Sequence, residues 1–235
     1  MVQITREDAE RDLICLGGNN ALRERRARWV LLHVPSGGPA PKVVAPAGAS
    51  LTNCHGMVTD KDKNIYLTYQ NDGKDQNCLI RWKPDATGGE FMTGGNTTLC
   101  DGTPHGLKIA TEDGKEYLYH ANNNQKLTKT TLDGTIVWQV VGNFGQDPKL
   151  PYRPTWFALP PDSKYTYLCD GYGSNNVYVF DRTDGRYTNV SYGGKGDRTQ
   201  HGKFATNHGC TWDPRNGKIA VSDRANSRFE YTHRT

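Results

Sequence analysis

Three histidines recur at regular spacing in this chain, and the imidazole side chain is the most common protein ligand for zinc. His55, His105 and His208 occupy the same position in the first, second and fourth of four repeated segments, and the third segment carries threonine there. We call these four positions the ladder and each of them a rung. The segments are Cys54-His-Gly-Met, Pro104-His-Gly-Leu, Pro154-Thr-Trp-Phe and Asn207-His-Gly-Cys. A spacing of about 50 residues is typical of repeat proteins, whose corresponding side chains converge when the repeats surround an axis. The ladder therefore predicts a shared metal site.

The ladder also has a purely structural interpretation. Each histidine would then cap a turn through a backbone hydrogen bond and fill the central channel, with no ion bound. Thr155 on the third rung favours this alternative, because it shows that the position does not require imidazole.

Each rung is followed by a similar passage of β-rich runs separated by polar turns, which predicts an all-β fold. The four copies run from His55 to Trp82, from His105 to Trp138, from Thr155 to Phe180 and from His208 to Tyr231. Three to four short strands in a repeat of this length are typical of a β-propeller blade. A solenoid is the main rival architecture.

About four blades are visible in residues 46–235, and propellers with this kind of repeat commonly need more blades to close. We therefore expect these residues to be part of a six-bladed propeller that is truncated at its C-terminus. Residues 1–45 are left as a segment of unassigned structure. Within it, the run from Thr5 to Leu13 reads as a capped helix that ends at Gly17-Gly18.

Composition argues against several classes of protein. The 235 residues carry a formal net charge of +4, much of it from arginines before residue 30, so a continuous basic face for nucleic acid is not expected. No stretch approaches the roughly 20 apolar residues of a membrane span. The first residues also lack the layout of a signal peptide.

The six cysteines contain no CxxC pair, which argues against a zinc ribbon. Their even number is compatible with disulfides, but the sequence determines neither which cysteines pair nor whether the protein works in an oxidising compartment.

A second pair of residues lies at corresponding places in the third and fourth copies, where a strand ends. Tyr172 belongs to Asp170-Gly-Tyr, and Arg224 belongs to Ser222-Asp-Arg. Both side chains are expected to project from turns near the channel, although they could also simply pack there while the aspartates stabilise the turns.

Together these residues resemble the six-bladed propeller of peptidyl-α-hydroxyglycine α-amidating lyases over roughly residues 50 to 232. The resemblance rests on Pro104-His-Gly-Leu, on Asp170-Gly-Tyr, and on His208 followed by Ala220-Val-Ser-Asp-Arg. The similarity to NHL-repeat blades in general is much less specific. The family cleaves a C-terminal α-hydroxyglycine to a peptide amide and glyoxylate, so a peptide or small amide substrate in the channel is implied.

The resemblance also implies roles for single residues. His105 and His208, two blades apart, would be zinc ligands, Tyr172 the catalytic tyrosine, and Arg224 the arginine that binds the substrate carboxylate or supports the tyrosine. A calcium ion and a secretory or extracellular location are further implications of the family.

The sequence departs from the family pattern in two places. The third zinc ligand would lie about 100 residues after His208 by the period of the repeat, beyond Thr235, and His55 is one blade out of phase. His55 is therefore expected only to line the channel. Gly173 stands where the family has a cysteine, so the disulfide that braces the tyrosine turn is not reproduced.

Two other functions remain open. The chain could be a non-catalytic NHL-type propeller that binds a peptide or protein partner on its top face. It could also be another six-bladed hydrolase such as a lactonase, which would need carboxylates and asparagines around calcium. The ladder carries no such carboxylates.

Overall fold

The computed structural model describes residues 43–49, 51–70, 77–92, 97–142 and 144–233. These residues fold into four antiparallel sheets arranged as the blades of a β-propeller, which confirms the predicted fold class. The helix expected between Thr5 and Leu13 lies outside the described residues, as does Cys15.

In each sheet the strands neighbour one another in chain order. The first sheet contains β1 (Thr52–Thr59), β2 (Ile65–Gln70), β3 (Leu79–Trp82) and β4 (Glu90–Phe91). The second contains β5 (Pro104–Glu112), β6 (Lys115–Asn122), β7 (Lys126–Thr130) and β8 (Ile136–Val141). The third contains β9 (Trp156–Ala158), β10 (Tyr165–Cys169), β11 (Asn176–Asp181) and β12 (Tyr187–Gly193). Within the described residues, the fourth contains β13 (Asn207–Asp213), β14 (Lys218–Asp223) and β15 (Arg228–Thr232).

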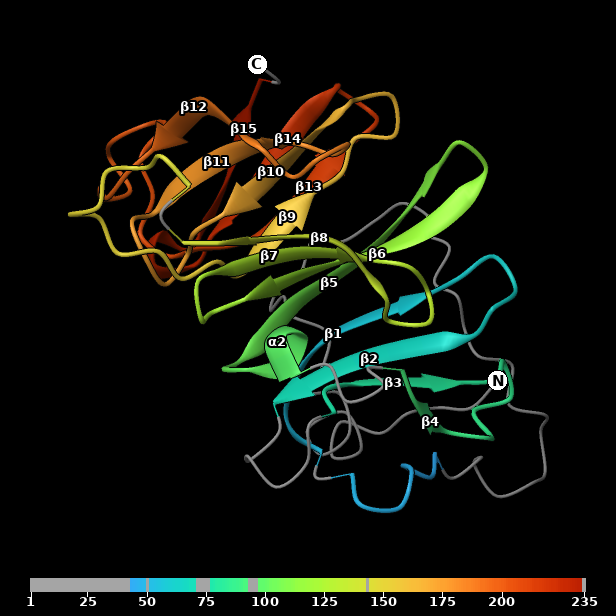
Figure 1. The fold of residues 1–235 in the computed structure, drawn as a ribbon. Helices are drawn as coiled ribbons and strands as arrows, with labels where there is room; N and C mark the ends of the chain where they lie inside the picture. The colour runs from blue at the N-terminus through green and yellow to red at the C-terminus, as the bar shows by residue number, and fades with distance from the viewer. Residues whose placement is uncertain (1–42, 50, 71–76, 93–96, 143, 234–235) are drawn as a thin grey trace, which may run out of the picture.

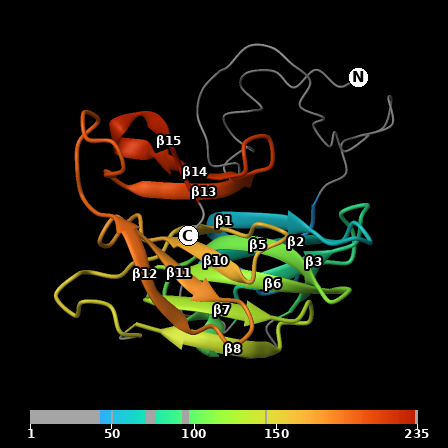
Figure 2. The same ribbon diagram turned by 90° about the horizontal axis from the view of Figure 1, so that it is seen from above.

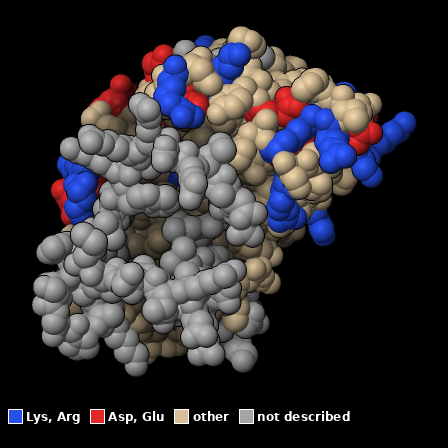
Figure 3. Space-filling view, turned by 180° about the vertical axis from the view of Figure 1, so that it is seen from behind, with Lys and Arg blue, Asp and Glu red and all other residues tan. Residues whose placement is uncertain are grey.

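Helical structure in the described residues is confined to short segments, α2 (Thr97–Cys100) and the 3-10 turn η1 (Arg224–Asn226). No helix in this part of the chain is long and apolar enough to cross a membrane. On the face shown in Figure 3, Lys and Arg side chains have Asp and Glu side chains among them.

The four sheets follow one another around an arc, from the first sheet in cyan to the fourth in red (Figures 1 and 2). Their first strands lie on the inside, with β1 next to β5, β5 next to β9, and β9 next to β13. This arrangement brings the start of each repeat to the same inner edge, where the ladder residues lie.

Apolar side chains fill the spaces between consecutive sheets. Tyr66 and Leu107 belong to the cluster between the first and second sheets, and Tyr119 and Phe157 to the cluster between the second and third. A third cluster packs β10 and β11 against β13 and β14. Because strand side chains alternate between two faces, each inner sheet contributes to the core on both sides.

The glycine that follows each ladder histidine has a packing role where the next sheet is present. A Cβ atom on Gly56 would lie 2.5 Å from the backbone nitrogen of Leu107, and one on Gly106 would lie 2.7 Å from the Thr155 carbonyl oxygen. A Cβ atom on Gly209 would meet only the Ser222 side chain, at an ordinary 3.7 Å. The first two glycines therefore allow consecutive inner strands to approach closely.

One disulfide is present in the described residues. Cys78, just before β3, is bonded to Cys100 at the end of α2, which answers part of the question that the cysteine count left open. The bond ties the first sheet to the connection that leads into β5.

The packing of these glycines predicts that two matched Gly→Ala substitutions lower the free energy of unfolding by different amounts. Gly106→Ala should lower the free energy of unfolding by about 1 to 3 kcal/mol, because its methyl group must displace the backbone of the neighbouring sheet. Gly209→Ala should change it by less than about 0.5 kcal/mol. Urea unfolding of both variants and the parent measures the difference, and equal losses in the two variants would contradict the packing argument.

Buried His120 predicts a loss of stability in acid. Its Nε2 atom lies 2.9 Å from the Thr130 hydroxyl, and burial lowers its pKa from 6.5 to about 3. The unfolded chain therefore binds a proton that the folded chain excludes, and stability falls as the pH drops from 6.5 toward 3.

His120→Gln should remove up to about 1.4 kcal/mol per pH unit from the slope of this loss. The measurement is the unfolding free energy at several pH values in this window. His201→Gln is the control, because the His201 side chain is 89% exposed. A slope that His120→Gln leaves unchanged would show that this residue is not a source of the acid sensitivity.

Candidate active site in the channel

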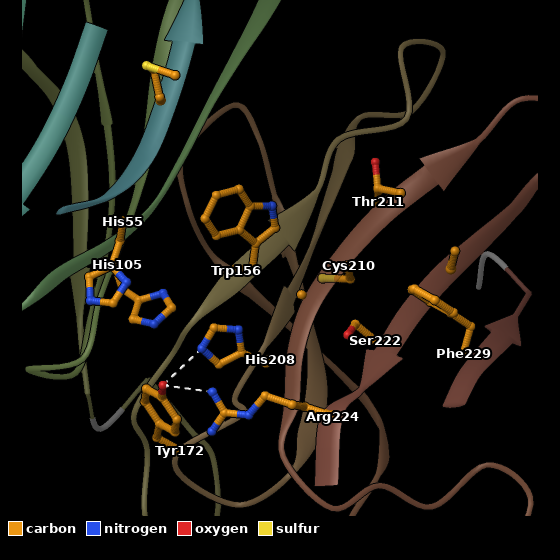
Figure 4. A pocket seen from close by; sticks show the side chains of 13 residues that line it. His55, His105, Trp156, Tyr172, His208, Cys210, Thr211, Ser222, Arg224 and Phe229 are labelled. Atoms are coloured by element: carbon orange, nitrogen blue, oxygen red, sulfur yellow. Dashed lines mark hydrogen bonds between the residues drawn. The ribbon is translucent and has the colours of Figure 1, made fainter. Parts of the chain in front are cut away.

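All five residues singled out in the sequence line one cavity of about 500 Å³ at the inner edge of the sheets (Figure 4). They are His55 on β1, His105 on β5, Tyr172 in the turn after β10, His208 on β13 and Arg224 after β14. The residues that a repeat period relates along the chain are thus brought together in space.

His105 is the most deeply buried member, with only 1% of its surface exposed. Its Nδ1 atom lies 2.8 Å from the Thr155 carbonyl oxygen, so Nδ1–H donates and Nε2 carries the free lone pair. The Nε2 atom is buried and has no hydrogen-bond partner. Burial, together with neighbouring His55 and His208, lowers the pKa of His105 to about 3, so the ring is neutral.

The other two imidazoles surround this ring differently. His55 stacks on His105 with ring centres 4.0 Å apart and planes inclined by 19°. His208 meets His105 edge to face, with centres 4.8 Å apart and planes inclined by 74°. The lone pair of an imidazole nitrogen lies in the plane of its ring, and the planes of two stacked rings are nearly parallel. The lone pairs of His55 and His105 therefore do not converge on one ion, and His55 only lines the channel.

Tyr172 connects His208 with Arg224. Its hydroxyl group lies 2.9 Å from His208 Nε2, and Arg224 Nη1 donates to the same hydroxyl oxygen at 3.3 Å (Figure 4). Because the arginine can only donate, the phenol proton is available for His208. The guanidinium carbon also lies 5.3 Å from the centre of the Tyr172 ring.

The electrostatics of this chain favour a neutral His208. Burial and the charge of Arg224 lower its pKa to about 4. A neutral imidazole keeps a lone pair for a proton or a metal ion, and a protonated ring does not.

The turn that carries Tyr172 is braced by a carboxylate in place of a disulfide. Asp170 accepts hydrogen bonds from the backbone N–H of Arg153 at 2.5 Å and of Ser174 at 2.7 Å. A Cβ atom on Gly173 would collide with the Asp170 carboxylate and lie 2.6 Å from Arg153 N. Glycine is therefore required at position 173.

The turn that carries Arg224 is built in the same way. Asp223 accepts from the backbone N–H of Ala205 at 2.6 Å, and Arg224 N–H donates to the Thr206 carbonyl oxygen at 3.0 Å. In both blades, an aspartate at the end of the second strand or directly after it ties its turn to the loop that enters the same blade.

One pair of histidines meets a distance condition for sharing a zinc ion. Two imidazoles that hold one tetrahedral ion through nitrogens about 2.0 to 2.1 Å away have ring centres roughly 5 Å apart. His105 and His208 meet this condition, and His105 has the tautomer of a typical ligand, with Nδ1–H bonded to a carbonyl oxygen. Among the described residues, however, no group of three or more His, Cys, Asp or Glu side chains could hold a metal ion.

The structure adds site residues that sequence reasoning did not single out. Trp156 stands where the other rungs have glycine, and its half-buried ring lines the cavity between His208 and the second sheet (Figure 4). Phe229 on β15 lines the cavity as well and is 68% exposed. The exchange of glycine for tryptophan at position 156 was a visible signal, whereas nothing in the sequence pointed to Phe229.

No protein-family model and no curated protein matches this sequence. Solved structures match at the level of the fold. An auxiliary nutrient binding protein from Bacteroides thetaiotaomicron superposes with a TM-score of 0.50 at 14% identity, over 76% of this chain and 48% of its own. A protein of unknown function from the same organism superposes with a TM-score of 0.50 at 12% identity, over 81% of this chain and 46% of its own.

The chain thus spans about half the length of these two structures. At such identities the likeness concerns the fold alone, and the fold that the chain shares is the β-propeller.

Proposed function

We propose that this chain forms the channel of an amidating-lyase-like propeller, which cleaves a peptidyl α-hydroxyglycine to a peptide amide and glyoxylate. The supporting observation is the hydrogen-bonded series of Arg224, Tyr172 and His208, which lies against buried His105. We further propose that the propeller is of the six-bladed, NHL-type class, with the four sheets of the described residues as four of its blades.

The chemistry requires a base for the hydroxyl proton of the substrate. As that proton leaves, the hydroxyl oxygen forms the carbonyl of glyoxylate, the C–N bond breaks, and a proton returns to the amide nitrogen. Tyr172 is suited to both transfers, because its phenolate, stabilised by Arg224, can take up the hydroxyl proton and return it to the amide nitrogen. A free Nη of Arg224 can also bind the substrate carboxylate.

His105 and His208 would hold the zinc ion, which supplies a positive charge that makes the substrate hydroxyl more acidic. The buried, unpartnered Nε2 atom of His105 supports this assignment, because a lone pair buried without a partner costs stability that a bound ion would offset. We also propose a secretory or extracellular location, which the Cys78–Cys100 disulfide favours.

A second candidate is a non-catalytic propeller that binds a peptide or protein. The observation in its favour is the pair of exposed aromatic side chains on β15, Phe229 at 68% and Tyr231 at 43%. Exposed aromatic side chains are frequent contact residues in protein interfaces.

Zinc binding is expected to depend on two of the three channel histidines. The purified chain should bind zinc, His105→Ala and His208→Ala should each lower the affinity at least tenfold, and His55→Ala should lower it by less than threefold. Because the pKa values of His105 and His208 are lowered to about 3 and about 4, affinity should change little between pH 7 and pH 5.5.

Metal analysis after dialysis and competition with a chromophoric chelator measure both effects. His201→Ala serves as the exposed control. Equal affinities in all four variants would contradict the assignment of the ligands.

Glyoxylate release is expected to depend on the Tyr172 hydroxyl. Tyr172→Phe should lower kcat on an N-acyl-X-α-hydroxyglycine at least a hundredfold, because general acid–base transfer typically contributes that much. Tyr231→Phe, which removes the hydroxyl of a tyrosine on β15 that does not line the cavity, is the matched control. Zinc binding without glyoxylate release by the parent chain would favour the partner-binding propeller.

A further inference from the structure

Two buried thiols lie directly behind the channel site. Cys169 is the last residue of β10 and is fully buried, and Cys210 on β13 is 4% exposed. Both belong to the apolar cluster that joins the third sheet to the fourth. Neither takes part in a disulfide in this structure.

The two thiols come from strands that contact each other, β10 and β13. The Cys210 thiol donates to the carbonyl oxygen of Tyr167 at 3.6 Å, and Tyr167 lies two residues before Cys169 on β10. Burial and the neighbouring Cys210 thiol together raise the pKa of the Cys169 thiol. Opposing strands of neighbouring blades therefore present their thiols to one point.

Both cysteines are connected to residues of the site. The Cys169 carbonyl oxygen accepts hydrogen bonds from the Thr155 N–H at 2.9 Å and from its hydroxyl at 3.2 Å, and Thr155 in turn orients His105. Cys169 also precedes Asp170, which braces the Tyr172 turn. Cys210 lies two residues after His208 on the same strand.

We infer that Cys169 and Cys210 are an oxidisable pair, and that a peroxide converts them to a disulfide that links the third and fourth sheets behind the channel. Cys210 is the residue that meets the oxidant, because it lines the cavity. The cavity of about 500 Å³ readily admits a molecule as small as hydrogen peroxide.

The reaction balances in two steps. The sulfur of Cys210 attacks one peroxide oxygen, the O–O bond breaks, and the products are a sulfenic acid and one water molecule. The Cys169 sulfur then attacks the Cys210 sulfur and displaces a second water molecule. Two thiols are oxidised by two electrons in total, and hydrogen peroxide is reduced to two molecules of water.

The order of these steps follows from the environment. Cys169 is fully buried and does not line the cavity, so it meets no oxidant itself and reacts only with its oxidised neighbour Cys210. The Cys78–Cys100 bond shows that this fold accommodates a disulfide between separate elements.

The test uses the full chain with Cys15→Ser and Cys54→Ser, which leaves the pair and the existing disulfide. The protein is treated with hydrogen peroxide, alkylated with N-ethylmaleimide, digested without reduction and analysed by mass spectrometry. We expect a cross-linked peptide that contains Cys169 and Cys210 and that separates on reduction. In the same background, Cys169→Ser should abolish this peptide and leave Cys210 as sulfenic or sulfinic acid.

A second measurement is independent of peptide mapping. The oxidised chain should unfold at a higher urea concentration than the reduced chain, and Cys169→Ser should remove the shift. If the background variant does not fold, the same two measurements on the unmodified chain decide the matter.

Three outcomes would overturn the inference. The first is full alkylation of both thiols after peroxide treatment. The second is a Cys210 sulfinic acid without any cross-link in the chain that retains Cys169, and the third is a disulfide from either cysteine to a second chain. None of these readouts depends on zinc or on glyoxylate release, so the inference and the proposed function can fail separately.

Discussion

The hydrogen bond from His105 to the Thr155 carbonyl oxygen is the contact on which the channel depends. It joins the second sheet to the third at the inner edge and fixes which nitrogen of the ring keeps its lone pair. It forms only because Gly106 lets the backbone of the next sheet approach so closely. Packing between blades and the chemistry of the site are thus set by the same few atoms.

The sequence pattern predicted the propeller and the convergence of the ladder, because both follow from local rules. Runs of β-branched and aromatic residues between polar turns became the strands, and a repeated position became the inner edge of the sheets. The candidate residues Tyr172 and Arg224 were placed beside His208 by the same periodicity.

Other features could not be predicted because they depend on contacts between distant segments. The structural interpretation of the ladder anticipated a backbone hydrogen bond for each histidine, but which carbonyl oxygen His105 reaches leaves no trace in residue type. The Cys78–Cys100 pairing was one of many that six cysteines allow. The sequence anticipated that Asp170 stabilises its turn, but the bond to the Arg153 N–H appears only in the folded loop. The stacking of His55 on His105 requires the actual angle between two sheets.

The hydrogen bond between Tyr172 and His208 has a consequence for the loading of a metal ion. One nitrogen lone pair of His208 accepts the phenol proton, and one lone pair cannot bind a proton and a cation together. An ion that takes this nitrogen would therefore release the Tyr172 hydroxyl to Arg224 alone. Without an ion, Tyr172 thus occupies the lone pair of His208 that a cation would need.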